Sequence, residues 1–190
     1  MSSSIDSELS ENWRRGPGIF VVVDVRGTVG ERIHDIQRAY DPKLANYLPP
    51  HITLVGSSGV GPILADTPPA ALRSTLAPIA ESIAPMSLTF GAPIRFMQTD
   101  IVVLPLDPHG PIRELHERIV RSRLSFQRAR FSFTPHVTLS FFRTLTPVQR
   151  RELLAIRIEE PFVVDHIRCS LTDEPLPPKG LFELTLTGKR

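Results

Sequence analysis

The chain is poor in cysteine and nearly balanced in charge. Cys169 is the single cysteine among 190 residues, and the formal net charge is +2. One cysteine excludes an internal disulfide and a metal cluster built from cysteines. Cys169 lies in a segment with the pattern of a β-strand, so we interpret it as a buried structural thiol rather than a nucleophile. A net charge this small says nothing by itself about a nucleic-acid partner.

Long hydrophobic runs and export signals are also missing. No stretch approaches the roughly 20 apolar residues that a membrane-spanning helix needs. Residues 1–6 contain neither a basic region nor an apolar run, so no export signal is visible. We therefore expect a cytoplasmic protein with no membrane partner.

Metal-binding and nucleotide-binding motifs are equally scarce. The six histidines form no His-x-His pair and no His-Glu-x-x-His motif. The glycine-rich segment 56–61 lacks the Lys-Ser/Thr ending of a nucleotide-binding loop, so we interpret it as a flexible rim rather than a phosphate cradle. We expect no catalytic metal and no cofactor.

Proline, by contrast, is abundant. Most of the 19 prolines fall between apolar runs, where they separate many short elements. A length of 190 residues suits one compact domain with a sizeable core. Residues 1–15 are polar and without pattern, which predicts a mobile N-terminal tail, and residues 16–190 are expected to form a single domain.

A five-residue motif occurs twice. Residues 50–54 read Pro-His-Ile-Thr-Leu, and residues 135–139, 85 positions later, read Pro-His-Val-Thr-Leu. Because side chains alternate along a β-strand, His and Thr share one face while the apolar residues point into a core. Two such strands brought together would line one cleft with the candidate site residues His51, Thr53, His136 and Thr138. The alternative is that the repeat only marks the same buried strand of an internal duplication. Buried polar groups need partners, so two polar residues on one strand face favour a site.

The segments around the motifs repeat as well. Each half reads strand, helix, motif strand, helix, strand, with one extra strand at the end. Thr67-Pro68 and Thr146-Pro147 are expected to cap the second helix of each half. We infer an α+β fold built by internal duplication. Its two lobes, about 16–98 and 99–190, are expected to carry antiparallel-type sheets with outer helices and to face each other across a central cleft.

Three further residues are candidates for substrate contact. Arg130 belongs to a basic segment that is either a solvated face or an electrostatic guide for a phosphate chain. It precedes His136 by an even number of residues and would share its face on an unbroken strand. Phe142 has the same parity, and both Phe142 and Tyr40 offer aromatic rings that could stack on a base, although core packing is the alternative for each.

The paired His-x-Thr motifs, one in each half of a chain of this length, resemble those of the 2H phosphoesterase superfamily, in particular its 2′-5′ RNA ligase-like and cyclic phosphodiesterase branch. The resemblance covers most of residues 17–188 as a pattern of elements, and its specific part is the two motifs. It implies the same bilobal fold. It also implies a substrate with a 2′,3′-cyclic phosphate, either an RNA end or a small cyclic nucleotide.

Two histidines without a metal suit phosphodiester chemistry. One neutral imidazole can accept a proton from the attacking oxygen while the other, as imidazolium, donates one to the leaving oxygen. The Thr53 and Thr138 hydroxyls would then hold the non-bridging phosphate oxygens. The motifs do not indicate which histidine is the base. We expect hydrolysis by a monomer, with 2′-5′ ligation as the reverse reaction.

Two other functions fit the sequence less well. An RNA-end binding module with little turnover would use the same cleft, but the intact His and Thr pairs favour an enzyme. A metal-dependent hydrolase is disfavoured because clusters of carboxylate and histidine ligands are missing from the motifs.

Overall fold

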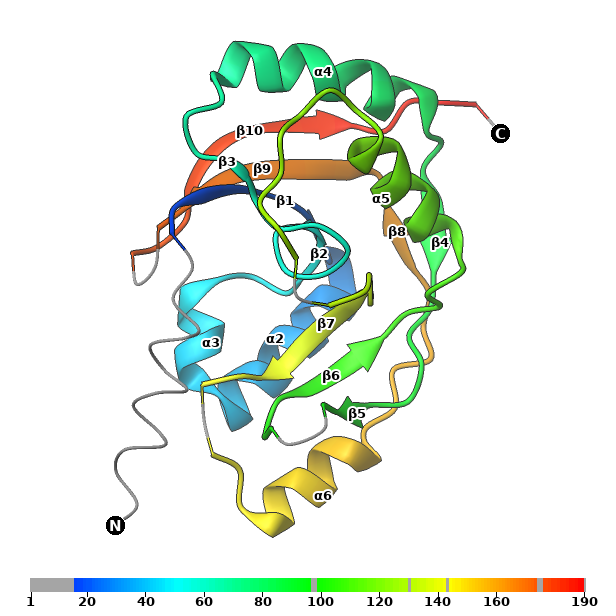
Figure 1. Cartoon of the computed structure of the whole chain (residues 1–190). Coiled ribbons are helices and arrows are strands. Elements are labelled where there is room, and N and C mark those ends of the chain that lie inside the picture. Colours follow the sequence, from blue (N-terminus) through cyan, green and yellow to red (C-terminus); the bar gives the residue numbers. More distant parts are fainter. Residues whose placement is uncertain (1–15, 97–98, 130, 143, 174–175, 190) are drawn as a thin grey trace.

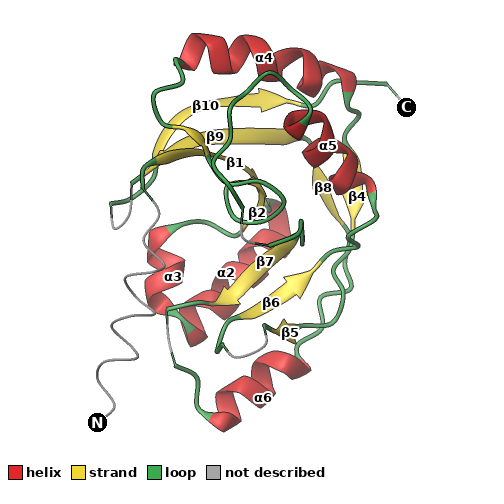
Figure 2. Cartoon of the chain, in the orientation of Figure 1, coloured by secondary structure: helices red, strands yellow, loops and turns green. Residues whose placement is uncertain are grey.

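The computed structural model describes residues 16–96, 99–129, 131–142, 144–173 and 176–189. The predicted tail, residues 1–15, and the candidate Arg130 lie outside the described residues. Within the described part of the chain, antiparallel strands form an eight-stranded sheet and a separate two-stranded sheet, with helices packed around them (Figures 1 and 2). The predicted α+β class with antiparallel sheets is confirmed.

The two motif strands lie side by side at the centre of the large sheet. They are β2 (His51–Val55) and β7 (His136–Ser140), and they pair antiparallel through Ile52 and Val137. Those two residues occupy the same position in the two copies of the motif. An approximate two-fold axis through this pair therefore places each histidine on the position of the other.

The next strand on each side repeats this symmetry. β1 (Gly18–Asp24) pairs with β2, and β6 (Val102–Pro105) pairs with β7. Both pairings contain the same irregularity, because β2 and β7 each carry one extra residue just after the motif threonine. A shared bulge at the same place in both copies supports the inferred duplication.

The outer strands do not sort into the predicted halves 16–98 and 99–190. β9 (His166–Thr172) and β10 (Lys179–Thr185) come from the second half but extend the sheet beyond β1. Conversely, β5 (Ile94–Arg95) comes from the first half and pairs with β6, and β4 (Met86–Leu88) pairs with β8 (Phe162–Val164). Each half thus completes the sheet edge of the other. The short β3 (Ile63–Leu64) pairs with β1.

The helices α2 (Gly27–Tyr40), α4 (Pro69–Ser82) and α5 (Pro111–Val120) cross between the halves in the same way, whereas α6 (Pro147–Ala155) packs within its own half. α2 packs on β7, and α5 contacts β2. α4 covers β10 at the top of Figure 1, and α6 packs on β6 at the bottom. None of the helices in the described ranges has the length and hydrophobicity needed to cross a membrane.

Two side chains cap helices in the described part of the chain, and one of them, Thr146, was predicted. Thr146 forms a capping box with Gln149 at the start of α6. Asp41 caps α3 (Pro42–Tyr47) by accepting from the Leu44 amide at 3.1 Å. The prediction for Thr67 was wrong, because the cap position of α4 falls on Pro68, which has no side-chain acceptor. With two prolines in succession, the second takes the first helical position.

The apolar residues of the motif strands lie in the core, as their alternation predicts. Ile52, Leu54, Val137 and Leu139 are all fully buried. Asp41 adds a polar link behind them, since its second carboxylate oxygen accepts from the amides of Phe141 and Phe142 at 2.6 and 2.7 Å. α3 is thereby fixed to the end of β7.

Candidate active site

One face of the central strands forms the floor of a cavity of about 540 Å³. Four neighbouring strands contribute to this floor, in the order β9, β1, β2 and β7. Their lining side chains are Arg168, Ser170 and Thr172 on β9, Phe20 and Val22 on β1, His51 and Thr53 on β2, and His136 and Thr138 on β7. Aromatic residues form much of the remaining wall. A volume of this size is typical of small-molecule sites.

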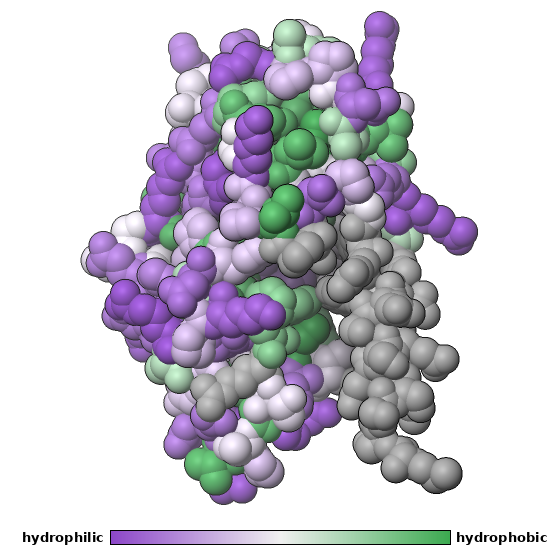
Figure 3. All heavy atoms as spheres, turned by 90° about the vertical axis from the view of Figure 1, so that its left-hand side faces the viewer, coloured by the Kyte–Doolittle hydropathy of each residue, from purple (hydrophilic) through white to green (hydrophobic). Residues whose placement is uncertain are grey.

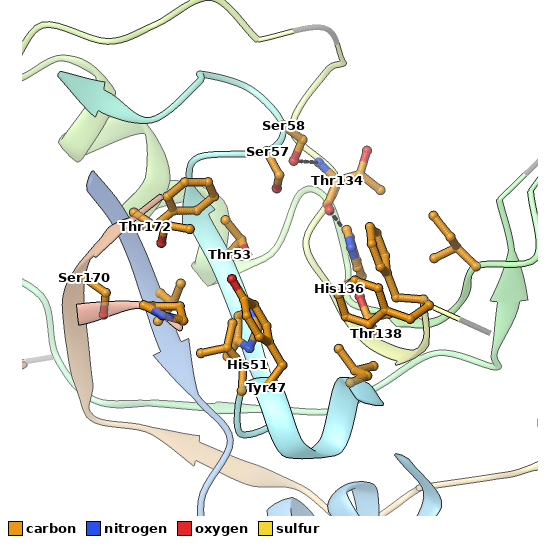
Figure 4. A pocket seen from close by; sticks show the side chains of 18 of the residues that line it. Tyr47, His51, Thr53, Ser57, Ser58, Thr134, His136, Thr138, Ser170 and Thr172 are labelled. Atoms are coloured by element: carbon orange, nitrogen blue, oxygen red, sulfur yellow. Dashed lines mark hydrogen bonds between the residues drawn. The ribbon is translucent and has the colours of Figure 1, made fainter. Parts of the chain in front are cut away.

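The structure brings the four motif residues together in this cavity (Figure 4). Because Ile52 pairs with Val137, His51 lies opposite Thr138 and Thr53 lies opposite His136. The two histidines are therefore diagonal neighbours, at a Cα separation of about 7–8 Å in a regular sheet. One small group, such as a phosphate, can lie between two imidazoles placed in this way.

Both imidazoles are anchored by the same local hydrogen bond. Nδ1 of His51 lies 2.8 Å from the carbonyl oxygen of Pro49, and Nδ1 of His136 lies 2.7 Å from that of Thr134. A carbonyl oxygen only accepts, so Nδ1 carries the proton in each ring. Nε2 is then the atom that exchanges protons, as a lone pair in the neutral ring and as a donor in the imidazolium.

The pKa of each motif histidine is lowered. Burial is the main cause for both. For His51, the bond to Pro49 and the nearby Asp24 carboxylate oppose the lowering, whereas Arg168 adds to it. For His136, the bond to Thr134 opposes it and the neighbouring His51 adds to it. Neutral imidazole is thus favoured in the free protein.

A charged network on the β9 side makes the site asymmetric. Asp24 lies opposite His51 on β1, whereas Pro105 occupies the corresponding place beside His136. Arg168 donates to both Asp24 oxygens, from Nε at 2.8 Å and from Nη2 at 2.6 Å. Burial opposes ionisation of Asp24, but its bonds with Arg168, together with His166 at 3.8 Å, hold the pKa of its carboxyl well below the usual range. The sequence motifs did not point to this pair.

Part of this network has the spacing of a metal site. Among the described residues, Asp24, His166 and Glu183 each offer one ligand atom within 4.8 Å of the others. Both carboxylates already face arginines, however, since Arg168 binds Asp24 and Arg26 lies 2.5 Å from Glu183. The residues that line the cavity include none of the three. An ion at this position would therefore not lie between the two motif histidines.

The opposite side of the cavity is aromatic. The Phe96 ring meets the His136 ring edge-on at a centroid distance of 5.1 Å. Phe142 lines the cavity together with its neighbour Phe141, remains 42% exposed, and lies 4.5 Å below the Lys43 ammonium. Tyr40 is not among the lining residues, because its hydroxyl donates to Glu152 on α6 at 3.1 Å. The structure therefore does not bring this predicted contact into the site.

The glycine-rich loop after β2 uses its amides within the protein. The Gly59 amide donates to the Phe131 carbonyl at 2.8 Å, and the Gly61 amide donates to the Gln127 carbonyl at 2.9 Å. Gly59 has a φ of 76°, and a Cβ there would lie 2.5 Å from the His116 ring. These two amides are directed into the protein, and the loop lines the cavity through Ser57 and Ser58.

Two His-x-Thr strands paired about a two-fold axis, over one cavity, define the class of 2H phosphoesterases. The chain belongs to the 2′-5′ RNA ligase superfamily, whose family model matches residues 26–174. No curated protein matches the sequence at a significant level.

Solved structures show the same fold at low sequence identity. Crystal structures of Escherichia coli LigT with ATP and with 3′-AMP share 17% and 15% identity with this chain, at TM-scores of 0.55 and 0.52. A crystal structure of a phosphoesterase shares 16% identity at a TM-score of 0.55. In all three comparisons the match covers 91% of this chain and 99% of the other.

Proposed function

We propose that this chain is a metal-independent 2′,3′-cyclic phosphodiesterase, acting as a cytoplasmic monomer on RNA ends or small cyclic nucleotides. The observation that carries the proposal is the pair of imidazoles on one cavity floor, each with Nδ1 anchored and Nε2 left for proton exchange. Membership of the 2′-5′ RNA ligase superfamily and the LigT complexes with ATP and 3′-AMP support a nucleotide substrate. Both histidines come from one chain, which supports a monomer as the working unit.

The reaction needs one proton accepted and one donated. The neutral histidine takes a proton from water, whose oxygen attacks phosphorus and forms the new P–O bond. The bond from phosphorus to the 2′ or 3′ oxygen breaks, and the protonated histidine gives its proton to that oxygen. Thr53 and Thr138, each beside its own histidine, donate hydroxyl hydrogen bonds to the non-bridging oxygens as negative charge develops there. With an RNA 5′-hydroxyl in place of water as the attacking group, the neutral histidine takes the proton of that hydroxyl, the bond from phosphorus to the 3′ oxygen breaks, and a 2′-5′ linkage results.

Turnover of defined substrates tests the proposal. Purified protein is incubated with a 2′,3′-cyclic mononucleotide and with a cyclic-phosphate oligoribonucleotide, and products are resolved by chromatography. We expect ring opening that survives EDTA, because protonic groups of the chain supply the catalysis. Loss of activity in EDTA, restored by a divalent ion, would instead favour a metal-dependent hydrolase.

The second candidate, an RNA-end binding module, is favoured by the low hydrogen-bonding capacity of the aromatic wall, which suits stacking of a base. Tight binding of a cyclic-phosphate oligoribonucleotide without ring opening, at enzyme and substrate concentrations that saturate the complex, would establish it.

A further inference from the structure

The β9 side of the cavity carries a cation that the proposed chemistry does not use. Arg168 lines the same cavity as His51 and Thr53, and its side chain is 20% exposed. Its guanidinium is fixed by two bonds to Asp24 and by a third, from Nη1 to the Ser170 hydroxyl at 2.9 Å. A guanidinium held in this way has little freedom to lose when it binds a ligand.

These bonds leave donors free for a ligand. Guanidinium has five N–H groups. Asp24 takes one hydrogen from Nε and one from Nη2, and Ser170 takes one from Nη1. One hydrogen on each terminal nitrogen remains, and both can donate charge-assisted hydrogen bonds to phosphate oxygens.

The position of Arg168 separates it from the reacting phosphate. Val22 on β1 pairs with Arg168 on one side and with Thr53 on the other, so Arg168 lies two strands from the histidine row. Two strand spacings amount to about 10 Å. The bonds to Asp24, which lies beside His51, draw the guanidinium back toward that row. A phosphate between the histidines and a group on Arg168 are thus neighbouring groups of one ligand.

We propose that Arg168 binds a second, non-reacting phosphate, so that the preferred substrates carry a phosphate beyond the cyclic one. This inference rests on the proposed function for the place of the first phosphate. The second one is either the 5′-phosphate of the same nucleotide or the adjacent internucleotide phosphate. Asp24 acts as a positioning residue, since it holds the guanidinium without reaching the ligand itself.

Calorimetric binding of product-like ligands tests the subsite without turnover. The three probes are adenosine 3′-phosphate, adenosine 3′,5′-bisphosphate and the dinucleotide ApAp. We expect at least one of the two doubly phosphorylated probes to bind roughly 10-fold or more tightly than the monophosphate, as a charge-assisted hydrogen-bonded pair predicts. The tighter of the two identifies the source of the second phosphate.

Variants assign the preference to Arg168. R168M should bind the preferred doubly phosphorylated probe and the monophosphate with about equal affinity. R168K, which keeps a charge but has no guanidinium, should lose most of the preference for the second phosphate. R32M is the matched control, because Arg32 is bonded to Glu160 and to a backbone carbonyl but does not line this cavity. This variant should keep the preference of the wild type for the doubly phosphorylated probe. If R168M does not fold, R168K alone decides.

Equal affinity for all three probes, or no measurable binding of any, would overturn the inference. A preference that survives in both Arg168 variants would overturn it as well. Intact preference without hydrolysis of any cyclic phosphate would instead end the proposed function and leave the second-phosphate subsite standing.

Discussion

His51 and His136 share a backbone anchor but have different neighbours. The ring of His51 has the Asp24–Arg168 ion pair beside it, whereas that of His136 has Phe96 and, across the strand pair, Pro105. Because each imidazole has its own proton to move, we expect the loss of either to remove most of the catalysis rather than half of it.

His51→Ala and His136→Ala should each lower kcat/KM on a cyclic mononucleotide by about 100-fold or more, the usual contribution of a general acid or base. Thr53→Ala and Thr138→Ala should lower kcat/KM by a smaller factor, since a neutral hydrogen bond contributes about 0.5–1.5 kcal/mol. His109→Ala, at an exposed turn outside the cavity, is the control. Near-normal kcat/KM in either motif-histidine variant would contradict the mechanism.

The lowered histidine pKa values determine the pH dependence. The base must be neutral and the acid protonated, so kcat/KM is greatest between the two pKa values of the free enzyme. Burial places both below the ordinary value of about 6.5. We therefore expect a maximum below about pH 6.5, with a fall at higher pH as the acid loses its proton. Steady-state rates across the range from about pH 4.5 to 8.5 measure this, and a profile that only rises above neutrality would contradict it.

Strand parity made the motif residues predictable, and the same reasoning could not find Arg168. His, Thr and their buried neighbours follow from alternation within five residues. The link between Arg168 and Asp24 spans 144 positions and depends on β9 pairing with β1. A strand can be recognised from its own residues, but its neighbour in a sheet cannot.

Among the elements, those defined by local chemistry were predicted best. The capping box of α6 begins at the predicted Thr146-Pro147 pair and is a contact between residues three apart. Apolar residues continue at helical spacing from α5 to Phe126, but the helix ends at Val120, because Phe126 forms a bridge with Ile63 in the first half. A long-range contact overrides the helical spacing there.

The two Thr-Pro sites allow a direct test of capping. Thr146→Ala should lower the free energy of unfolding by about 1 kcal/mol, since it removes the acceptor for the Gln149 amide. Thr67→Ala should change it by less than about 0.5 kcal/mol, because Thr67 is not the cap of α4. Urea unfolding of both variants gives the comparison. Equal decreases in the free energy of unfolding would show that the Thr146 cap does not stabilise the protein.

For the whole molecule, the exchange of strands makes the halves interdependent. A fragment of residues 16–98 lacks β9 beside β1 and β8 beside β4, so both strands lose a hydrogen-bonded neighbour. We expect this fragment alone to show no cooperative thermal unfolding, and to gain it when mixed with residues 99–190. Circular dichroism measured during heating follows the unfolding of the isolated fragment and of the mixture. A cooperative transition in the isolated fragment would contradict this dependence.

The Ile52–Val137 pair has a consequence for how such a site can come into being. A single half carries one imidazole and one hydroxyl, and its sheet edges are open on both sides. Two identical copies related by the axis through this pair would cover those edges by exchanging strands. They would also assemble the complete two-histidine site between them. In that symmetric ancestor every substitution would appear twice. Joining the copies into one chain removes the constraint, and a carboxylate–guanidinium pair on one side of the axis can then face a proline and aromatic rings on the other.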